Sequence, residues 1–402
     1  MRRAAIVAPI RTAVGKYGGS LKSISAGDLG AIVIKALMER TGVDPERIDD
    51  VVFSQGYGNG EAPCIGRWSA LAAGLPESIP GVQLDRRCGS GLQAVIDAAM
   101  RIQTGAADVV IAGGVESMSN VEYYSMDHRW GARSGSTTMH DRLTRGRVMS
   151  QPIARYGVIS GMIETANNLA RDYGITRQEC DAYAALSHQR ATAAWAAGKF
   201  DDELVPVAVP QRRGDPVIFA RDEGIREDAT AESLGKLPLI EKDGVVTAGN
   251  ASQQNDAGAA CLVVAEDKLA ELGLEPIGYF HSWAAAGCDP SRMGIGPVPA
   301  VEKLFARNGL SWSDIDLVEL NEAFAPQVLA CLKGWGWSAD DSRNDMLNVN
   351  GSGISLGHPI GATGGRILAN LMRELHRRNG RYGIETMCIG GGQGLAAIFE
   401  RA

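Results

Sequence analysis

Several features that would place this chain of 402 residues in a special class are missing from its sequence. No apolar run approaches the roughly 18 residues that a membrane-spanning helix needs. The apolar run at positions 4–10 is cut by Arg11 and lacks the cleavage site of a secretory signal, so it predicts a first β-strand. The formal net charge of −7 is mild and argues against a nucleic-acid partner. We therefore expect a cytoplasmic protein with neither a membrane nor a nucleic-acid partner.

Cysteine is also scarce, and the spacing of the cysteines does not indicate disulfide pairs. The chain has seven cysteines at scattered positions and no CxxC pair. An odd number without secretory context points to a reducing compartment, and the missing pairs make a structural zinc site improbable. Glycine, in contrast, is abundant at 50 residues but follows no period, which excludes a collagen-like chain. The length suits two or three globular domains.

The sequence contains an internal duplication. The segments RTGVDPERIDDVVF (40–53) and RNGLSWSDIDLVEL (307–320) align without gaps. Each is followed by a stretch that reads Gly-Ser-Gly, helix, turn, strand, Gly-Gly, at 88–114 and 350–392. Alternation of strands and helices predicts α/β layers, and the similarity of the halves predicts two copies of one unit. The alternative is a chance pairing of two α/β segments.

The region between the halves differs in composition and pattern. It is basic and rich in loops, and Thr176 and Glu179 have the spacing of a capping box that begins a helix ending at Gly198. We expect an inserted loop domain here, where long loops on a rigid scaffold usually carry binding. The predicted domains are a first half at 1–120 plus 251–273, the insert at 121–250, and a second half at 274–402.

One cysteine stands out in the stretch DRRCGSGLQAVIDAAM (85–100). Cys88 follows a strand-like run at 82–84 and precedes a helix beginning near Ser90. The positive end of a helix favours a thiolate, and Arg86 and Arg87 would add positive charge if they point toward it. This setting predicts a nucleophile. The alternative is a small residue required by a tight turn.

Three other positions could complete such a site. Of the six histidines, five lie in unremarkable polar settings, whereas His358 lies in GSGISLGHPIGATGG, the counterpart of the cysteine loop in the second half. Equivalent loops of a duplicated fold can converge, and a nucleophilic thiol needs a base. Cys388 ends a strand before IGGGQG, where free backbone N–H groups can bind an oxyanion. Asn321 ends the strand of VELNEAFA and can hold a water or a carbonyl.

A dinucleotide-binding loop does not explain these glycines. Only eight residues follow Gly394 in GGGQG, so no βαβ unit can close after it. The stretch GSGISLG has the wrong glycine spacing. Rossmann-type binding is therefore disfavoured.

Taken together, the motifs RRCGSGLQA, AGGVESMS, TAGNAS, MGIGPVPA, NEAFA, GHPIGATG and CIGGGQG follow one another in the order found in the thiolases. The chain resembles that family over practically its whole length. The resemblance implies an α/β fold, a five-layer α-β-α-β-α sandwich of two βαβαβαββ halves with an inserted loop domain. It also implies reversible Claisen condensation of acetyl-CoA with an acyl-CoA, and CoA-dependent thiolysis of a 3-oxoacyl-CoA.

The same resemblance implies a role for each loop. Cys88 would accept the acyl group, His358 would activate it and help bind the thioester oxygen, and Cys388 would be the acid/base. Asn321 would position a water of one oxyanion hole, and the N–H groups of Cys88 and Gly390 would form the other. No metal and no permanently bound cofactor are expected, with CoA as substrate and product. The implied CoA and substrate contacts are Met162, Arg226, Ser233, Leu237, Ser252, Met293, Ala323 and Phe324.

Some points depart from the family pattern or stay open. Gly161 and Ile163 stand where short-chain thiolases often carry histidine and glycine, and Gln253 replaces a common glycine. Short-chain, acetoacetyl-CoA-type activity is favoured, and a medium- or long-chain degradative thiolase is the alternative. Ketoacyl and hydroxymethylglutaryl-CoA synthases are disfavoured by CIGGGQG, and a non-catalytic CoA- or lipid-binding relative by the presence of both cysteines and the histidine. The 121–145 insert resembles the loop through which thiolase tetramers form, so a homotetramer is expected, with a dimer as alternative.

Overall fold

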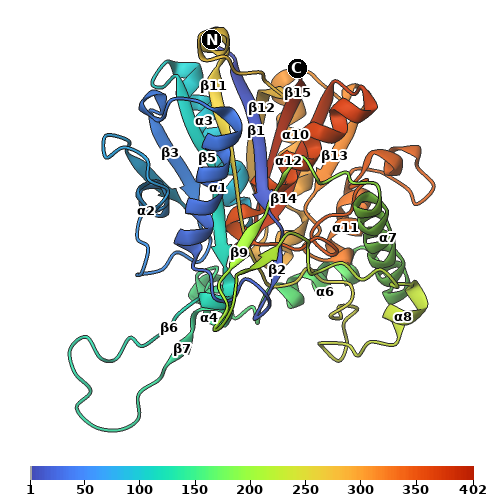
Figure 1. Ribbon diagram of the computed structural model, residues 1–402. Helices are drawn as coiled ribbons and strands as arrows, with labels where there is room; N and C mark the ends of the chain where they lie inside the picture. Colours follow the sequence, from blue (N-terminus) through green and yellow to red (C-terminus); the bar gives the residue numbers. More distant parts are fainter. Residues whose placement is uncertain (1) are drawn as a thin grey trace.

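The first half of the chain builds a mixed sheet in the order β4-β3-β5-β11-β1 (Figure 1). Strand β3 runs parallel to β4 and β5, and β11 is antiparallel to β5 and β1. Every residue of β5 and β11 is buried, as expected of strands covered on both faces. The computed structural model describes residues 2–402. The strand bounds are β1 Ala4–Thr12, β3 Asp50–Ser54, β4 Gly81–Leu84, β5 Val109–Ser117 and β11 Asn255–Ala265.

The second half repeats this pattern in the order β13-β14-β15-β12. Strands β13 and β14 are parallel, while β15 is antiparallel to β14 and β12. A single parallel bridge between Val318 and Leu347 stands where the first half has its β3–β4 pair. The duplication expected from the sequence is thereby confirmed at the level of sheet topology. The bounds are β12 Gly278–Gly287, β13 Leu317–Leu320, β14 Tyr382–Ile389 and β15 Gln393–Arg401.

Helices complete five layers. One apolar core lies between the first sheet and the outer helices α1 and α2, and another lies between the second sheet and α10 and α11. The third core holds α3 and α12, which pack against each other between the two sheets. This is the expected α-β-α-β-α sandwich. The bounds are α1 Ala26–Thr41, α2 Ile65–Ala72, α3 Ser90–Thr104, α10 Pro297–Asn308, α11 Ala325–Gly334 and α12 Ile360–Arg378.

The two sheets are also joined directly. Residues Ala4–Ile6 of β1 pair with Gly278–Phe280 of β12 in antiparallel register, so the hydrogen-bonded strands form one sheet of eleven. The short strands β2 (Gly15–Lys16) and β8 (Leu204–Val205) pair with β11 and β1. The duplicated halves are therefore bonded edge to edge as well as packed face to face.

The chain between β5 and β11 forms the insert. Its long helix α7 begins with the predicted capping box of Thr176 and Glu179, and Gly198 follows its end in the left-handed conformation. Helices α6 and α7 pack against α11 of the second half. The elements are β6 Tyr123–Tyr124, β7 His140–Asp141, α4 Arg142–Val148, α5 Ile153–Tyr156, α6 Met162–Asp172, α7 Arg177–Ala196, β9 Val207–Val209, β10 Val217–Phe219 and α8 Ala231–Gly235.

A buried ion-pair group ties the insert to the first strand. Arg11 of β1 is bonded to Glu203 at 2.6 Å and to Asp222 at 2.7 Å, and all three side chains are almost fully buried. A charge in such a position is tolerated only when it is paired and hydrogen-bonded.

Short segments complete the fold: α9 Leu269–Leu272 and the 3-10 helices η1 Pro45–Arg47, η2 Arg87–Gly89, η3 Met118–Asn120, η4 Glu266–Lys268, η5 Pro290–Ile295, η6 Trp312–Asp314 and η7 Ser342–Met346.

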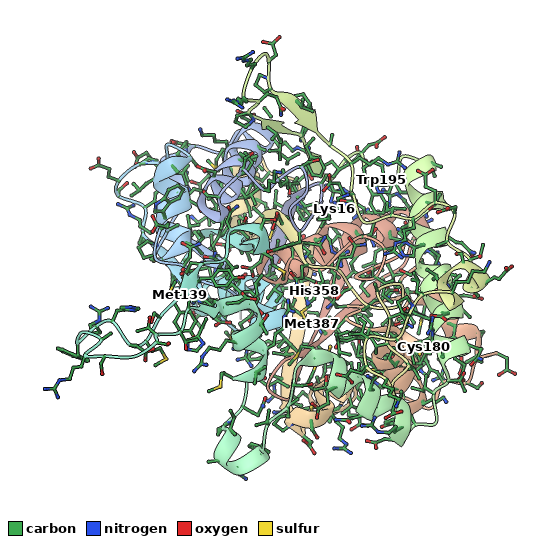
Figure 2. The ribbon with its side chains drawn as sticks, turned by 90° about the horizontal axis from the view of Figure 1, so that it is seen from below. Lys16, Met139, Cys180, Trp195, His358 and Met387 are labelled. Atoms are coloured by element: carbon green, nitrogen blue, oxygen red, sulfur yellow. The ribbon has the colours of Figure 1, made fainter. Side chains whose placement is uncertain are left out.

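One loop of the insert leaves the body of the molecule. The hairpin β6–β7 carries a long projecting loop at its tip (Figure 1). In the view from below, Met139 lies on this loop, whereas His358 lies near the centre of the molecule (Figure 2). None of the helices formed by residues 2–402 is long and apolar enough to cross a membrane.

Candidate active site

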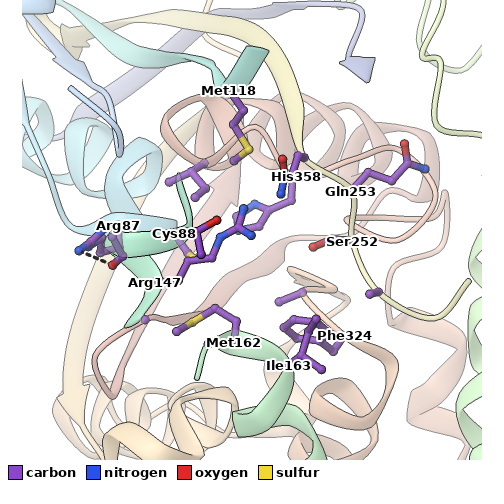
Figure 3. Close-up of a pocket in the computed structure, with 18 of the residues that line it drawn as sticks. Arg87, Cys88, Met118, Arg147, Met162, Ile163, Ser252, Gln253, Phe324 and His358 are labelled. Carbon is purple, nitrogen blue, oxygen red and sulfur yellow. Dashed lines mark hydrogen bonds between the residues drawn. The ribbon is translucent and has the colours of Figure 1, made fainter. Parts of the chain in front are cut away.

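The two central helices touch at their N-terminal ends through glycine. A Cβ atom on Gly91 would lie only 2.7 Å from the backbone nitrogen of Gly364, and a Cβ on Gly364 would collide with Leu92. Only residues without a side chain permit this approach. The loops that enter the helices, with Cys88 before α3 and His358 before α12, are consequently brought to one place (Figure 3).

Local backbone geometry fixes Cys88. After β4, Arg87 begins the short helix η2 in a left-handed conformation with φ of 50°, and η2 leads directly into α3. A non-glycine residue in this region is strained and often found at functional sites. Ser90 accepts a hydrogen bond from the backbone N–H of Arg86 at 2.8 Å, which closes the turn. Cys88 is thereby held partly exposed on the wall of a cavity.

The predicted thiolate character of Cys88 is wrong for the free protein. Burial raises the pKa of its thiol above the usual value. The backbone N–H of Gly390 and the positive charges of Arg87 and Arg147 lower the pKa but do not outweigh burial. Cys88 is therefore a thiol at neutral pH and must lose its proton to a base during reaction.

This protonation state gives a measurable pH dependence. Because the thiolate is the reactive form, alkylation of Cys88 by iodoacetamide is expected to accelerate about tenfold per pH unit from pH 7 to 9. The rate is followed by mass spectrometry of the peptide that contains Cys88, in a Cys64→Ala background that removes an exposed thiol. A rate that reaches its plateau below pH 8 would show a preformed thiolate.

His358 is placed as a neutral base. Burial and the nearby Arg366 lower its pKa to about 3, so the imidazole is uncharged at neutral pH. Its Nδ1 lies 2.7 Å from the hydroxyl of Thr363, and its backbone N–H donates to Asn255 at 2.9 Å. If Nδ1 carries the ring proton and donates to Thr363, then Nε2 is the acceptor of the ring, for a transferred proton or for the amide of Asn321 3.4 Å away.

Cys388 and Asn321 lie directly behind this cavity. Cys388, the penultimate residue of β14, packs with Met293, Ala323 and Phe324 of the cavity wall and is fully buried. Burial raises its pKa well above the usual value, and the neighbouring Cys88 adds to the rise. The amide nitrogen of Asn321 lies 3.4 Å from Nε2 of His358, while its buried carbonyl oxygen has no hydrogen-bond partner among residues 2–402. That oxygen is free to receive a ligand or a water.

The cavity has a volume of about 550 Å³, and six of the eight predicted CoA and substrate contacts line it. Ala251 and Phe324 form a β-bridge, and the N–H of Ser252 donates to the carbonyl of Ala323 at 2.9 Å. The lining contacts are Met162, Arg226, Ser252, Met293, Ala323 and Phe324. The other two, Ser233 and Leu237, lie outside the lining; Ser233 belongs to the capping box of α8.

Another histidine departs from the prediction. His188 of α7 is buried, and burial together with Arg226 lowers its pKa to about 4. Its Nδ1 accepts a hydrogen bond from the backbone N–H of Arg226 at 3.2 Å. His188 is therefore a support of the Arg226 loop rather than an unremarkable polar residue.

Sequence reasoning also missed residues that shape the site. Arg147 of α4 lines the cavity beside Cys88 (Figure 3), although the run RLTRGR offered a signal in its clustered arginines. Glu116 at the end of β5 accepts hydrogen bonds from the N–H groups of Gly56 at 2.9 Å and Gly361 at 3.0 Å. It thus links the first half to the start of α12. Residues 2–402 contain no group of three or more metal-binding side chains.

Comparison with known proteins agrees with this geometry. Residues 4–267 match the family model of the thiolase N-terminal domain, and residues 274–401 match that of the thiolase C-terminal domain. The chain is 48% identical to the acetyl-CoA acetyltransferase of Chromobacterium violaceum, with 99% of each chain covered.

Solved structures of other proteins are similar to this one over its whole length. The crystal structure of the Bacillus anthracis acetyl-CoA acetyltransferase superposes with a TM-score of 0.94 at 42% identity, covering 100% of this chain and 99% of the other. Human mitochondrial 3-ketoacyl-CoA thiolase in complex with CoA superposes with a TM-score of 0.92 at 40% identity, covering 100% and 98%. Together with these relatives, the duplicated fold and its converging cysteine and histidine identify an acyltransferase. The chain belongs to the thiolase family.

Proposed function

We propose that this protein is an acetyl-CoA C-acyltransferase. It would condense acetyl-CoA with an acyl-CoA and, in reverse, cleave a 3-oxoacyl-CoA with CoA. The observation that carries the proposal is the convergence of Cys88 and His358 on one cavity, with Cys388 packed behind its wall. Arg226 and Ser252 line the same cavity. The human relative solved in complex with CoA supports CoA as a ligand of this protein.

In the first half-reaction, Cys88 attacks the thioester carbonyl of the bound acyl-CoA. Nε2 of His358 accepts the thiol proton, and the N–H groups of Cys88 and Gly390 stabilise the oxyanion. The tetrahedral intermediate collapses by breaking the C–S bond to CoA. Cys388 protonates the departing CoA sulfur, so the products are CoA, acyl-Cys88, a Cys388 thiolate and a protonated His358.

In the second half-reaction, acetyl-CoA replaces CoA. The Cys388 thiolate removes a proton from the acetyl α-carbon, and the enolate is stabilised by protonated His358 and by a water held on Asn321. The enolate carbon attacks acyl-Cys88, a C–C bond forms, and the C–S bond to Cys88 breaks. The Cys88 thiolate recovers its proton from His358, which restores the starting enzyme. The mechanism needs neither a metal nor a permanently bound cofactor.

Among acyl chains that end in a methyl group, we propose a preference for the shortest. Several relatives are named acetyl-CoA acetyltransferase. Within the cavity, Met162 and Ile163 of α6 occupy space that a long chain would need, and the sulfur of Met162 would lie 3.3 Å from a Cβ on Gly390. An apolar wall so close to the reacting thioester favours a small acyl group.

The test is thiolysis of methyl-ended 3-oxoacyl-CoAs of increasing chain length by the full chain. The expected result is the highest kcat/KM for acetoacetyl-CoA, and the Ile163→Gly variant should shift activity toward longer chains. A wild-type kcat/KM that rises with chain length would overturn the short-chain assignment and favour the degradative alternative. Absence of turnover at every length would overturn the proposed function itself.

We also propose that the protein is a homo-oligomer, a tetramer rather than a dimer. The support is the projecting loop between β6 and β7, on which Met126, Trp130 and Met139 expose 65%, 94% and 60% of their surface. Exposed large apolar side chains clustered on one loop are typical of an interface. Mass photometry that finds only monomers would exclude the proposal. In this proposal, the insert at 121–250 combines CoA binding with oligomerisation. It separates a first half at 1–120 plus 251–273 from a second half at 274–402.

A further inference from the structure

The carboxylate of Glu116, near the end of β5, is held by backbone N–H groups. One oxygen accepts hydrogen bonds from Gly56 at 2.9 Å and Gly361 at 3.0 Å, and the other accepts from Tyr57 at 3.2 Å. Glu116 is fully buried, and within residues 2–402 it forms no ion pair with a cationic side chain. Because a buried carboxylate is costly unless its oxygens are hydrogen-bonded, these three donors stabilise it in this position.

The three donors belong to two loops that are far apart in the sequence. Gly56 and Tyr57 follow β3 in the first half, whereas Gly361 is the second residue of α12 in the second half. The first turn of a helix leaves its N–H groups without partners inside the helix, and the positive end of the helix attracts an anion. Glu116 therefore bonds one loop of each half to a single carboxylate.

The contact with Gly361 fixes the loop that carries His358. A Cβ on Gly361 would lie 2.2 Å from the carbonyl of Val115, so this loop lies directly on the end of β5. The carbonyl of Gly361 accepts a further hydrogen bond from the hydroxyl of Ser54 at 2.7 Å. His358 comes shortly before Gly361 in the chain and lines the cavity together with Cys88 (Figure 3). A shift of Gly361 would consequently displace the imidazole.

These hydrogen bonds need an ionised carboxylate. Burial raises the pKa of Glu116 to about 7; the three N–H donors oppose the rise, and the nearby charge of Asp85 adds to it. At about pH 8 the group is mostly ionised, and both of its oxygens act as acceptors. A neutral group of the same shape would place a donor against one of the N–H groups.

We propose that Glu116 is a positioning residue whose carboxylate holds the His358 loop in place for proton transfer from Cys88. This inference rests on the proposed thiolase function. In the first half-reaction the proton moves from the sulfur of Cys88 to Nε2 of His358, and Glu116 neither gains nor loses a proton. Glu116 acts on the rate through geometry, because a displacement of about 1 Å at a reacting group can cost about 10²-fold.

The test is a double-mutant cycle on one step, the acetylation of Cys88 by acetyl-CoA at about pH 8, followed by time-resolved mass spectrometry. The Glu116→Gln variant should lower the acetylation rate and kcat by about 10- to 100-fold. The KM for CoA should stay within about twofold, because no proposed CoA contact donates to Glu116. In a His358→Ala background, Glu116→Gln should have no further effect on the acetylation rate.

The matched control is Glu374→Gln, which removes an equally inaccessible carboxylate from the opposite end of α12. Glu374 is bonded to cationic side chains, so its replacement should lower the unfolding temperature and leave kcat unchanged. Should Glu116→Gln fail to fold, Glu116→Asp takes its place in the cycle. It keeps the charge, but it is one methylene group too short to reach all three donors, so the same loss is expected.

An acetylation rate that Glu116→Gln leaves unchanged would overturn the inference while the proposed function stands. Equal fold-losses in the wild-type and His358→Ala backgrounds would do the same, because Glu116 would then act independently of the imidazole. Wild-type protein that neither becomes acetylated on Cys88 nor catalyses thiolysis would overturn the proposed function and the inference together.

Discussion

Replacement of Cys88 by alanine is expected to lower kcat for thiolysis by about 10⁴-fold or more, because the covalent route through acyl-Cys88 is lost. The fold should be unaffected, since Cys88 lies on the cavity wall at the edge of the central core. The direct measurement is mass spectrometry after incubation with acetyl-CoA. Wild-type protein should carry one acetyl group on the peptide that contains Cys88, and the variant none.

The control for this experiment is Cys64→Ala, which removes an exposed thiol that does not line the cavity. It should retain both turnover and acetylation. Acetyl found on another residue, with the Cys88 peptide unmodified, would remove Cys88 from its proposed role. Substantial thiolysis by Cys88→Ala would point to the same conclusion.

Replacement of Cys388 by alanine is expected to separate the two half-reactions. Condensation and thiolysis should fall by about 10²- to 10⁴-fold, the usual contribution of a general acid or base. Acetylation of Cys88 by acetyl-CoA should persist at a reduced rate. The departing CoA sulfur is weakly basic and can take its proton from another donor, whereas removal of a proton from the α-carbon requires Cys388. Turnover assays and time-resolved mass spectrometry of the Cys88 peptide measure the two effects on one sample.

A matched control is available in Cys331→Ala, another fully buried thiol near Cys388. Its removal leaves a comparable small cavity without touching the proposed acid/base. Equal losses of acetylation and turnover in a folded Cys388→Ala variant would show that the division of roles between the cysteines is wrong. Equal losses of turnover in Cys388→Ala and Cys331→Ala would indicate that the loss comes from disturbed packing and not from a missing acid/base.

Much of the fold could be predicted because local signals and global topology agree. Near the start of the aligned segments, Gly42 and Gly309 end helices α1 and α10, and both adopt the left-handed conformation that stops a helix. Each then leads into the corresponding strand, β3 or β13. The hydrogen bonding between β1 and β12 was not predicted, because pairing between distant strands depends on how whole layers pack.

The convergence of the Cys88 and His358 loops was predictable from the sequence, and the electrostatics of these residues were less so. The sequence places Cys88 at a helix start, but the raised pKa of its thiol depends on burial by residues distant in sequence, such as Ile389 beside Gly89. The same holds for His188, which is polar in its sequence context but buried in α7. The entry of Arg147 into the cavity depends on how α4 packs against Tyr57, whose hydroxyl bonds to Leu143, and a short basic run does not determine that packing.

The way in which the two halves are joined limits how they can move relative to each other. A site whose parts come from two halves would open and close if those halves could hinge. Here the β1–β12 pairing bonds them at one edge, and the contact of Gly91 with Gly364 leaves no room for sliding at the centre. The catalytic geometry is therefore preorganised before any substrate arrives. We therefore expect the inserted loops, rather than the two halves, to move when substrates enter and leave.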